Sequence, residues 1–190
     1  RIYLHSGEKK YLTGNLKYFR KYLNMLKEKE NEEGFIEYGL HDWANPDNNE
    51  VLTPTELINA VYRVKFTNIA ALAARLSGED DMEFAREAER QKELIINKYI
   101  TEDGKCTVSE QTAIAMILYH DVYESPQIKS QLKKCVEDKQ FHHSCGMVGI
   151  RHLYQALNKC GLQEYAYKIV TAQGYPSYSL WLENGATTLW

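Results

Sequence analysis

The last seventeen residues of this 190-residue chain combine aromatic rings with a single carboxylate. Between Gly174 and Trp190 lie Tyr175, Tyr178, Trp181, Trp190 and the acidic Glu183. Flat rings stack on the apolar faces of pyranose sugars, while amides and carboxylates bind the hydroxyls. The stretch therefore favours a carbohydrate-binding edge. The alternative is a loop whose rings cover the hydrophobic core.

Potential metal ligands occur together only in His142-His143-Ser144-Cys145. Adjacent histidines point in different directions, and no second cluster lies at ligand spacing, so we expect no metal and no cofactor. The four cysteines, Cys106, Cys135, Cys145 and Cys160, form no C-x-x-C pair. Free thiols are the favoured interpretation over disulfides or metal ligation.

Composition excludes two classes of partner. A formal net charge of -3 gives no basic surface for nucleic acid. The longest apolar run, 113–119, is far too short to cross a membrane. Hydrophobic residues at 44% and charged residues at 26% suit one globular domain. No signal peptide is visible. However, the chain begins at Arg1 without Met, so we expect an upstream segment to be missing, and the absence of a signal peptide says nothing about secretion.

Apolar residues at steps of three and four predict seven helices. They cover 8–30, 54–76, 79–100, 109–122, 126–139, 147–159 and 162–172. Long connections alternate with short turns, and the helix after each long connection is the more apolar one. This alternation predicts stacked antiparallel hairpins, each with one inner and one outer helix, and an inner position for 54–76, 109–121 and 147–159.

Three helix starts carry capping signals. Thr53-Pro54-Thr55-Glu56 and the pair Thr107 and Glu110 resemble capping boxes, and Ser125-Pro126 offers a cap followed by a first-turn proline. We therefore assign Glu56 a structural role rather than a catalytic one. Residues 186–190 could open a further helix after Asn184-Gly185.

The hairpins suit either an open superhelical solenoid or a closed toroid. Solenoids show a sequence repeat of fixed period, and none is present here, so the toroid is favoured. All long connections then lie on one edge, at the N-termini of the inner helices, where loops carry function. That edge collects His41, Asp42, Trp43, Gln111, His142, His143, Tyr175, Tyr178, Trp181 and Glu183.

Several motifs resemble the catalytic domain of bacterial α-L-rhamnosidases of glycoside hydrolase family 78. The ending, Tyr175-Pro176-Ser177-Tyr178 followed by the residues from Leu182 to Trp190, is the specific one. Gly39-Leu40-His41-Asp42-Trp43 resembles the family's Gly-Leu-Gly-Asp-Trp loop, with His41 in place of glycine. The weaker motifs 53–58, 111–113 and 146–149 fall in the family's order, and the resemblance covers nearly the whole chain.

The resemblance implies an all-α, partial (α/α)6 toroid, with residues 1–190 forming an incomplete catalytic domain truncated at both ends. It also implies inverting hydrolysis of a terminal α-L-rhamnoside, which needs a general acid and a general base ~6.5–9.5 Å apart. The acid is expected upstream of Arg1 and the base directly after Trp190. Glu183 is the fallback base. The fragment alone is therefore predicted to be inactive.

The same resemblance implies substrate-binding roles within the chain. We expect Asp42 to accept hydrogen bonds from rhamnose hydroxyls, with Trp43 packing on the ring and His41 beside them. Tyr178, Trp181 and Trp190 would line the edge of the site. The alternatives are an Asx turn for Asp42 and a core position for Trp190.

Two other functions stay open. One is a non-catalytic helical-repeat module that recognises a partner along one edge. The other is a toroidal glycosidase or lyase of different specificity. An incomplete toroid should also leave apolar inner faces exposed or covered by a second copy, so self-association is a further expectation.

Overall fold

The structure is a computed structural model that describes residues 2–46, 50 and 52–188. These residues form ten helices and no named strand; one isolated bridge joins Ile100 and Cys106. The helices are α1 (Ile2–Ser6), α2 (Lys10–Thr13), α3 (Leu16–Lys27), α4 (Thr55–Ser77), α5 (Met82–Tyr99), α6 (Gln111–Tyr119), α7 (Pro126–Asp138), α8 (Ile150–Lys159), α9 (Gln163–Val170) and α10 (Tyr178–Glu183). The predicted all-α class is confirmed. Within the described residues, no helix is both long and apolar enough to cross a bilayer.

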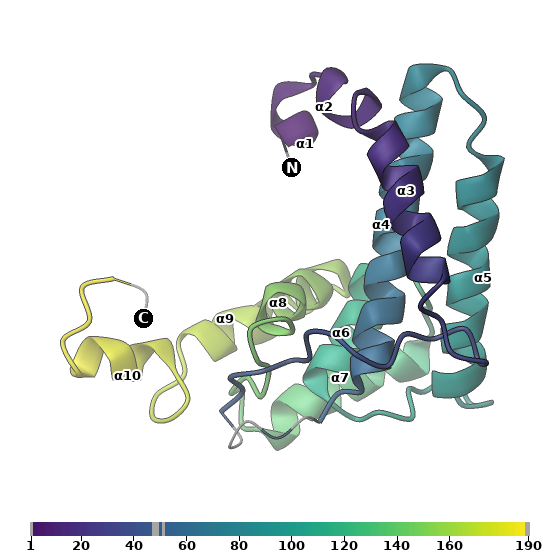
Figure 1. The fold of residues 1–190 in the computed structure, drawn as a ribbon. Coiled ribbons are helices and arrows are strands. Elements are labelled where there is room, and N and C mark those ends of the chain that lie inside the picture. Colours follow the sequence, from purple (N-terminus) through teal and green to yellow (C-terminus); the bar gives the residue numbers. More distant parts are fainter. Residues whose placement is uncertain (1, 47–49, 51, 189–190) are drawn as a thin grey trace.

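Three antiparallel hairpins organise the chain: α4 with α5, α6 with α7, and α8 with α9 (Figure 1). Short turns close each hairpin at 78–81, 120–125 and 160–162. Eight of the nine residues of α6 are buried, against three of the thirteen in α7. Since α6 packs against both α4 and α8, these three helices form the inner layer that the alternation predicts.

The N-terminal part differs from prediction. The single helix expected over 8–30 is split into α2 and α3. Gly14 and Asn15 separate them, and both are weak helix formers. The Asn15 side chain instead donates a hydrogen bond to the carbonyl of Tyr11 at 3.0 Å. The helix that residues 186–190 could open is also absent at 186–188, and residues 189–190 lie outside the described part.

One helix was not predicted. The aromatic ending, interpreted as a loop, contains α10. Ser177 begins this helix because its hydroxyl oxygen accepts a hydrogen bond from the backbone N–H of Leu180 at 3.1 Å.

The capping predictions are right once and wrong twice. Ser125 caps α7 by accepting from the backbone N–H of Ile128, with proline at the first helical position. No side chain caps α4 or α6. Glu56 instead accepts a hydrogen bond from the hydroxyl of Tyr99 and pairs with Lys98 at 2.9 Å. Glu56 therefore joins α4 to α5, a structural role of another kind.

A buried ion network fixes the segment after α3 against the first hairpin. Arg63 of α4 is only 3% exposed, and its guanidinium pairs with Glu30 and with Glu87 of α5. Arg90 binds the same two carboxylates. Because both partners are present, the charge of Arg63 is balanced locally.

The three hairpins form an arc. Figure 1 shows α1 and α2 at one end and α10 at the other, both on the same side of α4, with the arc open between them. The sides of α4 and α8 that border this opening, called their inner sides below, face away from the folded core.

Candidate functional site

The long connections meet on one edge, which we call the loop rim: residues 35–46, 100–110, 139–149 and 171–177. The backbone N–H of Met147 donates to the carbonyl of Trp43 at 2.9 Å. The hydroxyl of Tyr175 donates to the carbonyl of Pro46 at 3.4 Å. Lys105 and Ser109 line one cavity together with Lys139 and Ser144, so the 100–110 connection lies beside 139–149. The predicted gathering of the long loops on one edge is therefore confirmed.

Asp42 lies at the centre of this rim and is only 6% exposed. One carboxylate oxygen accepts from the backbone N–H groups of Val148 and Gly149, at 2.9 and 2.8 Å. The other accepts from the N–H of Gly146 at 2.9 Å and from the hydroxyl of Thr112. A carboxylate offers about four lone-pair sites, so these four donors occupy them all.

This arrangement makes Asp42 a cap for a distant helix. Helix α8 begins at Ile150, and no side chain of its own first turn caps it. The orphan N–H groups at a helix start favour an anion, which Asp42 supplies from more than a hundred residues away. These bonds are long-range, unlike the local Asx turn given as the alternative for Asp42, and the predicted binding of a sugar hydroxyl by Asp42 stays a prediction.

Two glycines permit this close approach. A Cβ at Gly149 would overlap the hydroxyl oxygen of Thr112, and one at Gly146 would overlap the carbonyl oxygen of Trp43. Glycine is needed at both positions because a side chain would not fit, and not because of backbone flexibility. The Gly146-Met-Val-Gly149 spacing thus lets the turn before α8 fold around the Asp42 carboxylate.

Gln111 anchors a second loop. Its side chain is 1% exposed, accepts from the backbone N–H of Ser144 at 2.9 Å and donates to the carbonyl of His142 at 3.1 Å. Together with Thr112, it makes the first turn of α6 the fixed point on which the 140–149 connection rests. The His142-His143-Ser144-Cys145 segment is held by this amide.

The aromatic residues border a small cavity of about 220 Å³ between the 44–46 segment and the chain ending. Tyr178 and Trp181 contribute two of its walls, with ring centroids 5.0 Å apart in an edge-to-face arrangement. Tyr175, Pro46 and His143 also border it. Such a cavity matches one sugar ring in character, with several rings and a few polar groups.

Three other predicted site residues, Trp43, His41 and Glu183, do not line this cavity. Trp43 is 46% exposed, so its ring is accessible on the rim. His41 is half-buried, and its Nδ1 has no hydrogen-bond partner among the described residues. Glu183 ends α10 on the exposed surface and does not border the rim cavity. Trp190 lies outside the described residues.

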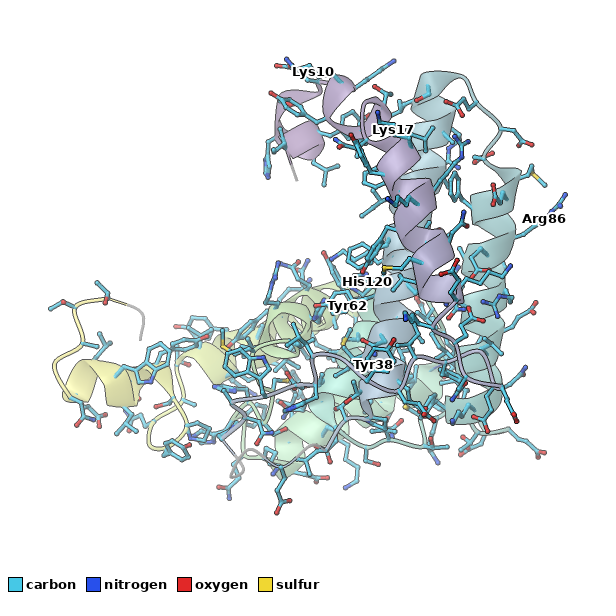
Figure 2. All side chains as sticks on the ribbon, in the orientation of Figure 1. Lys10, Lys17, Tyr38, Tyr62, Arg86 and His120 are labelled. Atoms are coloured by element: carbon cyan, nitrogen blue, oxygen red, sulfur yellow. The ribbon has the colours of Figure 1, made fainter. Side chains whose placement is uncertain are left out.

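An aromatic and histidine cluster on the inner wall was missed from the sequence. Tyr62 of α4, His120 at the end of α6 and His152 of α8 lie in mutual ring contact, and His120 and His152 have ring centroids 5.1 Å apart. Figure 2 shows Tyr62 and His120 close together beside α4. Burial, reinforced by His152 and Lys65, lowers the pKa of His120 to about 3.

A depressed histidine pKa predicts acid sensitivity. His120 titrates near 6.5 when unfolded, so below that pH the unfolded chain binds more protons, and stability falls as pH falls toward about 3. Since the ring is partly exposed, we expect a loss of about 1 kcal/mol between pH 7 and pH 5 from this group. The measurement is urea unfolding at both pH values for the natural chain and His120→Phe.

Because the buried Nε2 of His120 has no partner among the described residues, phenylalanine loses no hydrogen bond there. His152, Lys65, Lys159 and Asp121 face the same ring and are unchanged in the variant. A variant that loses as much stability as the natural chain would show that other groups carry the acid sensitivity.

An arc of antiparallel helical hairpins, with long connections gathered around aromatic side chains on one edge, defines the class of α/α-hairpin toroid domains. A sequence model of the family described as bacterial alpha-L-rhamnosidase 6 hairpin glycosidase domain matches residues 1–190. The chain belongs to this family, and the predicted partial α/α toroid is confirmed.

Relatives from two organisms are similar to this chain in sequence. An alpha-L-rhamnosidase of Streptomyces avermitilis is 26% identical over 155 residues, which cover 80% of this chain and 15% of that protein. One of Formosa agariphila is 27% identical over 173 residues, covering 83% of this chain and 18% of that protein. The chain thus spans less than a fifth of the length of either relative.

The structure of an alpha-L-rhamnosidase from Dictyoglumus thermophilum has a TM-score of 0.84 and 26% identity, over 97% of this chain and 22% of that one. The Streptomyces avermitilis enzyme complexed with L-rhamnose gives a TM-score of 0.88 over 97% of this chain and 18% of that one. At 24% identity, that second likeness supports the fold alone.

Proposed function

We propose that this chain forms part of a longer six-hairpin domain that removes terminal α-L-rhamnose from glycosides or polysaccharides with inversion. The observation that carries the proposal is the family match along residues 1–190 together with an aromatic cavity on the loop rim. Relatives that match the chain are named alpha-L-rhamnosidases.

The proposed chemistry divides between this chain and the rest of the domain. The loop rim supplies rings for the sugar, with Trp43, Tyr178 and Trp181 as the binding residues. Inverting cleavage needs an acid that protonates the leaving oxygen and a base that activates water on the other face. We assign both carboxylates to the longer polypeptide, outside residues 1–190, with Glu183 as the fallback base.

The test is hydrolysis of nitrophenyl α-L-rhamnoside by the longer polypeptide, with the anomer of the first product read by proton NMR. Release of β-L-rhamnose supports inverting cleavage. Release of the α-anomer contradicts inversion, and release of no rhamnose while another glycoside is cleaved contradicts the substrate.

The inner sides of α4 and α8 enter the proposal as well. We assign them to contact with the other hairpins of the domain. In the isolated chain a second copy would cover them, which is the form of self-association that an incomplete toroid favours.

Replacing Trp43 by alanine is expected to weaken rhamnose binding about tenfold in the longer polypeptide. The ring is nearly half exposed, so its removal takes away a stacking surface without opening the core. Isothermal calorimetry with free L-rhamnose measures the affinity, and the melting temperature should change by less than about 2 °C.

Tyr167→Ala is the matched control, since Tyr167 is a 71% exposed ring on α9, outside the loop rim. Equal affinity of the Trp43→Ala variant and the natural protein for rhamnose would remove Trp43 from the site.

A further inference from the structure

One residue of the His142-His143-Ser144-Cys145 segment borders the rim cavity, the cavity of about 220 Å³ between the 44–46 segment and the chain ending. His143 lines it together with Tyr178 and Trp181, which the proposed function takes as sugar-binding rings. The sequence singles out this segment for its histidines, and the proposed function gives them no role. An imidazole on the wall of a sugar-binding cavity is a candidate for recognising a hydroxyl group.

Most of the other polar side chains on the cavity wall are engaged within the protein. Four of them make a hydrogen bond to another residue of the chain: Asn45, Tyr175, Ser177 and Tyr178. The side chains that remain are the indole of Trp181 and the imidazole of His143. An indole N–H can only donate a hydrogen bond, whereas a neutral imidazole can donate or accept one. His143 is therefore the side chain best suited to a hydroxyl in this cavity.

The two ring nitrogens of His143 lie in different surroundings. The residue is half-buried, and its Nδ1 is fully buried without a hydrogen-bond partner among the described residues. Nε2 is thus the nitrogen left for a ligand. Burial lowers the pKa of His143, the backbone of Cys145 opposes this shift, and His142 adds to it. The ring is then neutral at pH 7, which suits an uncharged sugar better than an acidic group.

The backbone on both sides of His143 is anchored. The Nε2 of His142 lies 3.0 Å from the carbonyl oxygen of Gln173, which ties this segment to the connection leading into the aromatic ending. On the other side, the amide of Gln111 accepts a hydrogen bond from the backbone N–H of Ser144 at 2.9 Å. His143 is therefore held at the cavity wall before a ligand arrives, and less entropy is lost on binding.

We propose that His143 is a specificity-determining residue of this site, whose Nε2 forms a hydrogen bond with one hydroxyl of the rhamnose that lies against Tyr178 and Trp181. The inference rests on the proposed function, which assigns the rim cavity to the sugar. Terminal rhamnose combines free hydroxyls with an apolar methyl group. The aromatic rings bind the apolar part, and the imidazole distinguishes sugars by the position of a hydroxyl.

The experiment compares nitrophenyl α-L-rhamnoside with its monodeoxy analogues, each lacking a different free hydroxyl. The longer polypeptide is assayed as the natural protein and as His143→Phe, which keeps a ring of similar shape without a nitrogen. For at least one analogue, the ratio of kcat/KM, rhamnoside over analogue, should be about tenfold larger in the natural protein. Comparing both proteins on the same analogue cancels the analogue's altered intrinsic reactivity, and a purely structural role would lower kcat/KM for all substrates alike.

His120→Phe is the matched control. Like His143, His120 has a buried ring nitrogen without a partner among the described residues, but it contacts Tyr62 beside α4 and does not border the rim cavity (Figure 2). All ratios should equal those of the natural protein. Circular dichroism checks that each variant is folded, and His143→Ala, which adds no bulk, replaces His143→Phe in the same comparison if the latter is unfolded.

Equal ratios in the natural protein and the His143 variant for every analogue overturn the inference, because His143 then supports only the fold of the loop. No cleavage of any rhamnoside contradicts the proposed function instead. Calorimetry with L-rhamnose and its monodeoxy analogues then decides the inference alone. It is supported if the variant no longer distinguishes one analogue from rhamnose, and it is overturned if both proteins discriminate equally or bind none of these sugars.

Discussion

Replacing Asp42 by asparagine is expected to lower the free energy of unfolding of the 190-residue chain by about 3 kcal/mol. All four hydrogen bonds to this carboxylate come from donors, three of them backbone N–H groups. An amide places an NH₂ group against two of these donors, leaving buried groups unpaired at roughly 1–3 kcal/mol each. For a chain of this size the melting temperature should fall by about 6–12 °C.

The matched control is Asp138→Asn. Asp138 is an exposed carboxylate of α7 that pairs with Lys134 one helical turn away at 3.0 Å. Such a pair contributes less than about 1 kcal/mol, so this variant should unfold close to the natural chain. A second variant, Thr112→Val, removes one donor to Asp42 with little change of shape and should cost about 1 kcal/mol.

The same variants decide between the two roles of Asp42. If the carboxylate anchors the rim, the double variant Asp42→Asn, Thr112→Val is less destabilised than the sum of the single variants, because the two groups interact. Unchanged stability of Asp42→Asn combined with lost rhamnose affinity in the longer polypeptide would instead support the direct sugar contact.

The helices were largely predictable because their signals are local. The pattern of apolar residues in 54–76 and 109–122 predicted helices that are buried on several sides. The buried residues of α4 and α6 agree with this prediction. Gly78 follows the predicted helix 54–76 and adopts a left-handed conformation with φ of 73° directly after α4, as expected of a glycine that ends a helix. The alternation of connection lengths then predicted the hairpins and the edge on which the long connections meet.

The capping box predicted before α4 failed for a physical reason. A threonine with a glutamate three residues later caps a helix only if no better partner is near. Glu56 finds the hydroxyl of Tyr99 and the ammonium of Lys98, both on α5. Tertiary partners of this kind are invisible in a local pattern.

The centre of the site was predictable in location but not in geometry. The motif 39–43 directed attention to Asp42, yet three of its four partners lie more than a hundred residues along the chain. The spacing of Gly146 and Gly149 before an apolar helix was the available signal, since paired glycines often mark a close backbone approach. Without a repeat or a local contact, the sequence offers no way to join the two motifs.

The loop rim therefore consists of long connections that buried polar side chains hold in place. Gln111, Thr112 and Asp42 bind the connections through buried side chains, while the rings of Trp43 and Tyr175 remain accessible. Buried polar anchors of this type hold binding residues in place before the ligand arrives, which reduces the entropy lost on binding.

The 190-residue chain alone is expected to release no nitrophenol from nitrophenyl α-L-rhamnoside, even at high protein concentration. Acid–base cleavage needs two carboxyl groups facing the same glycosidic bond. Asp42 is buried with all its lone pairs occupied, and Glu183 is exposed at the end of α10, away from the rim cavity. At most one member of the pair is then available, and loss of either member removes most of the catalysis.

The comparison protein is the longer polypeptide that carries the remaining hairpins, which should turn over at a rate at least about a thousandfold higher. Glu183→Gln in that polypeptide separates the two assignments of the base. Retained activity places the base elsewhere, whereas a loss of more than about a hundredfold with unchanged KM makes Glu183 the base. Turnover by the isolated chain with an inverted product would show that both carboxylates lie within residues 1–190, and Glu183 with a carboxylate freed from the rim would become the pair to test.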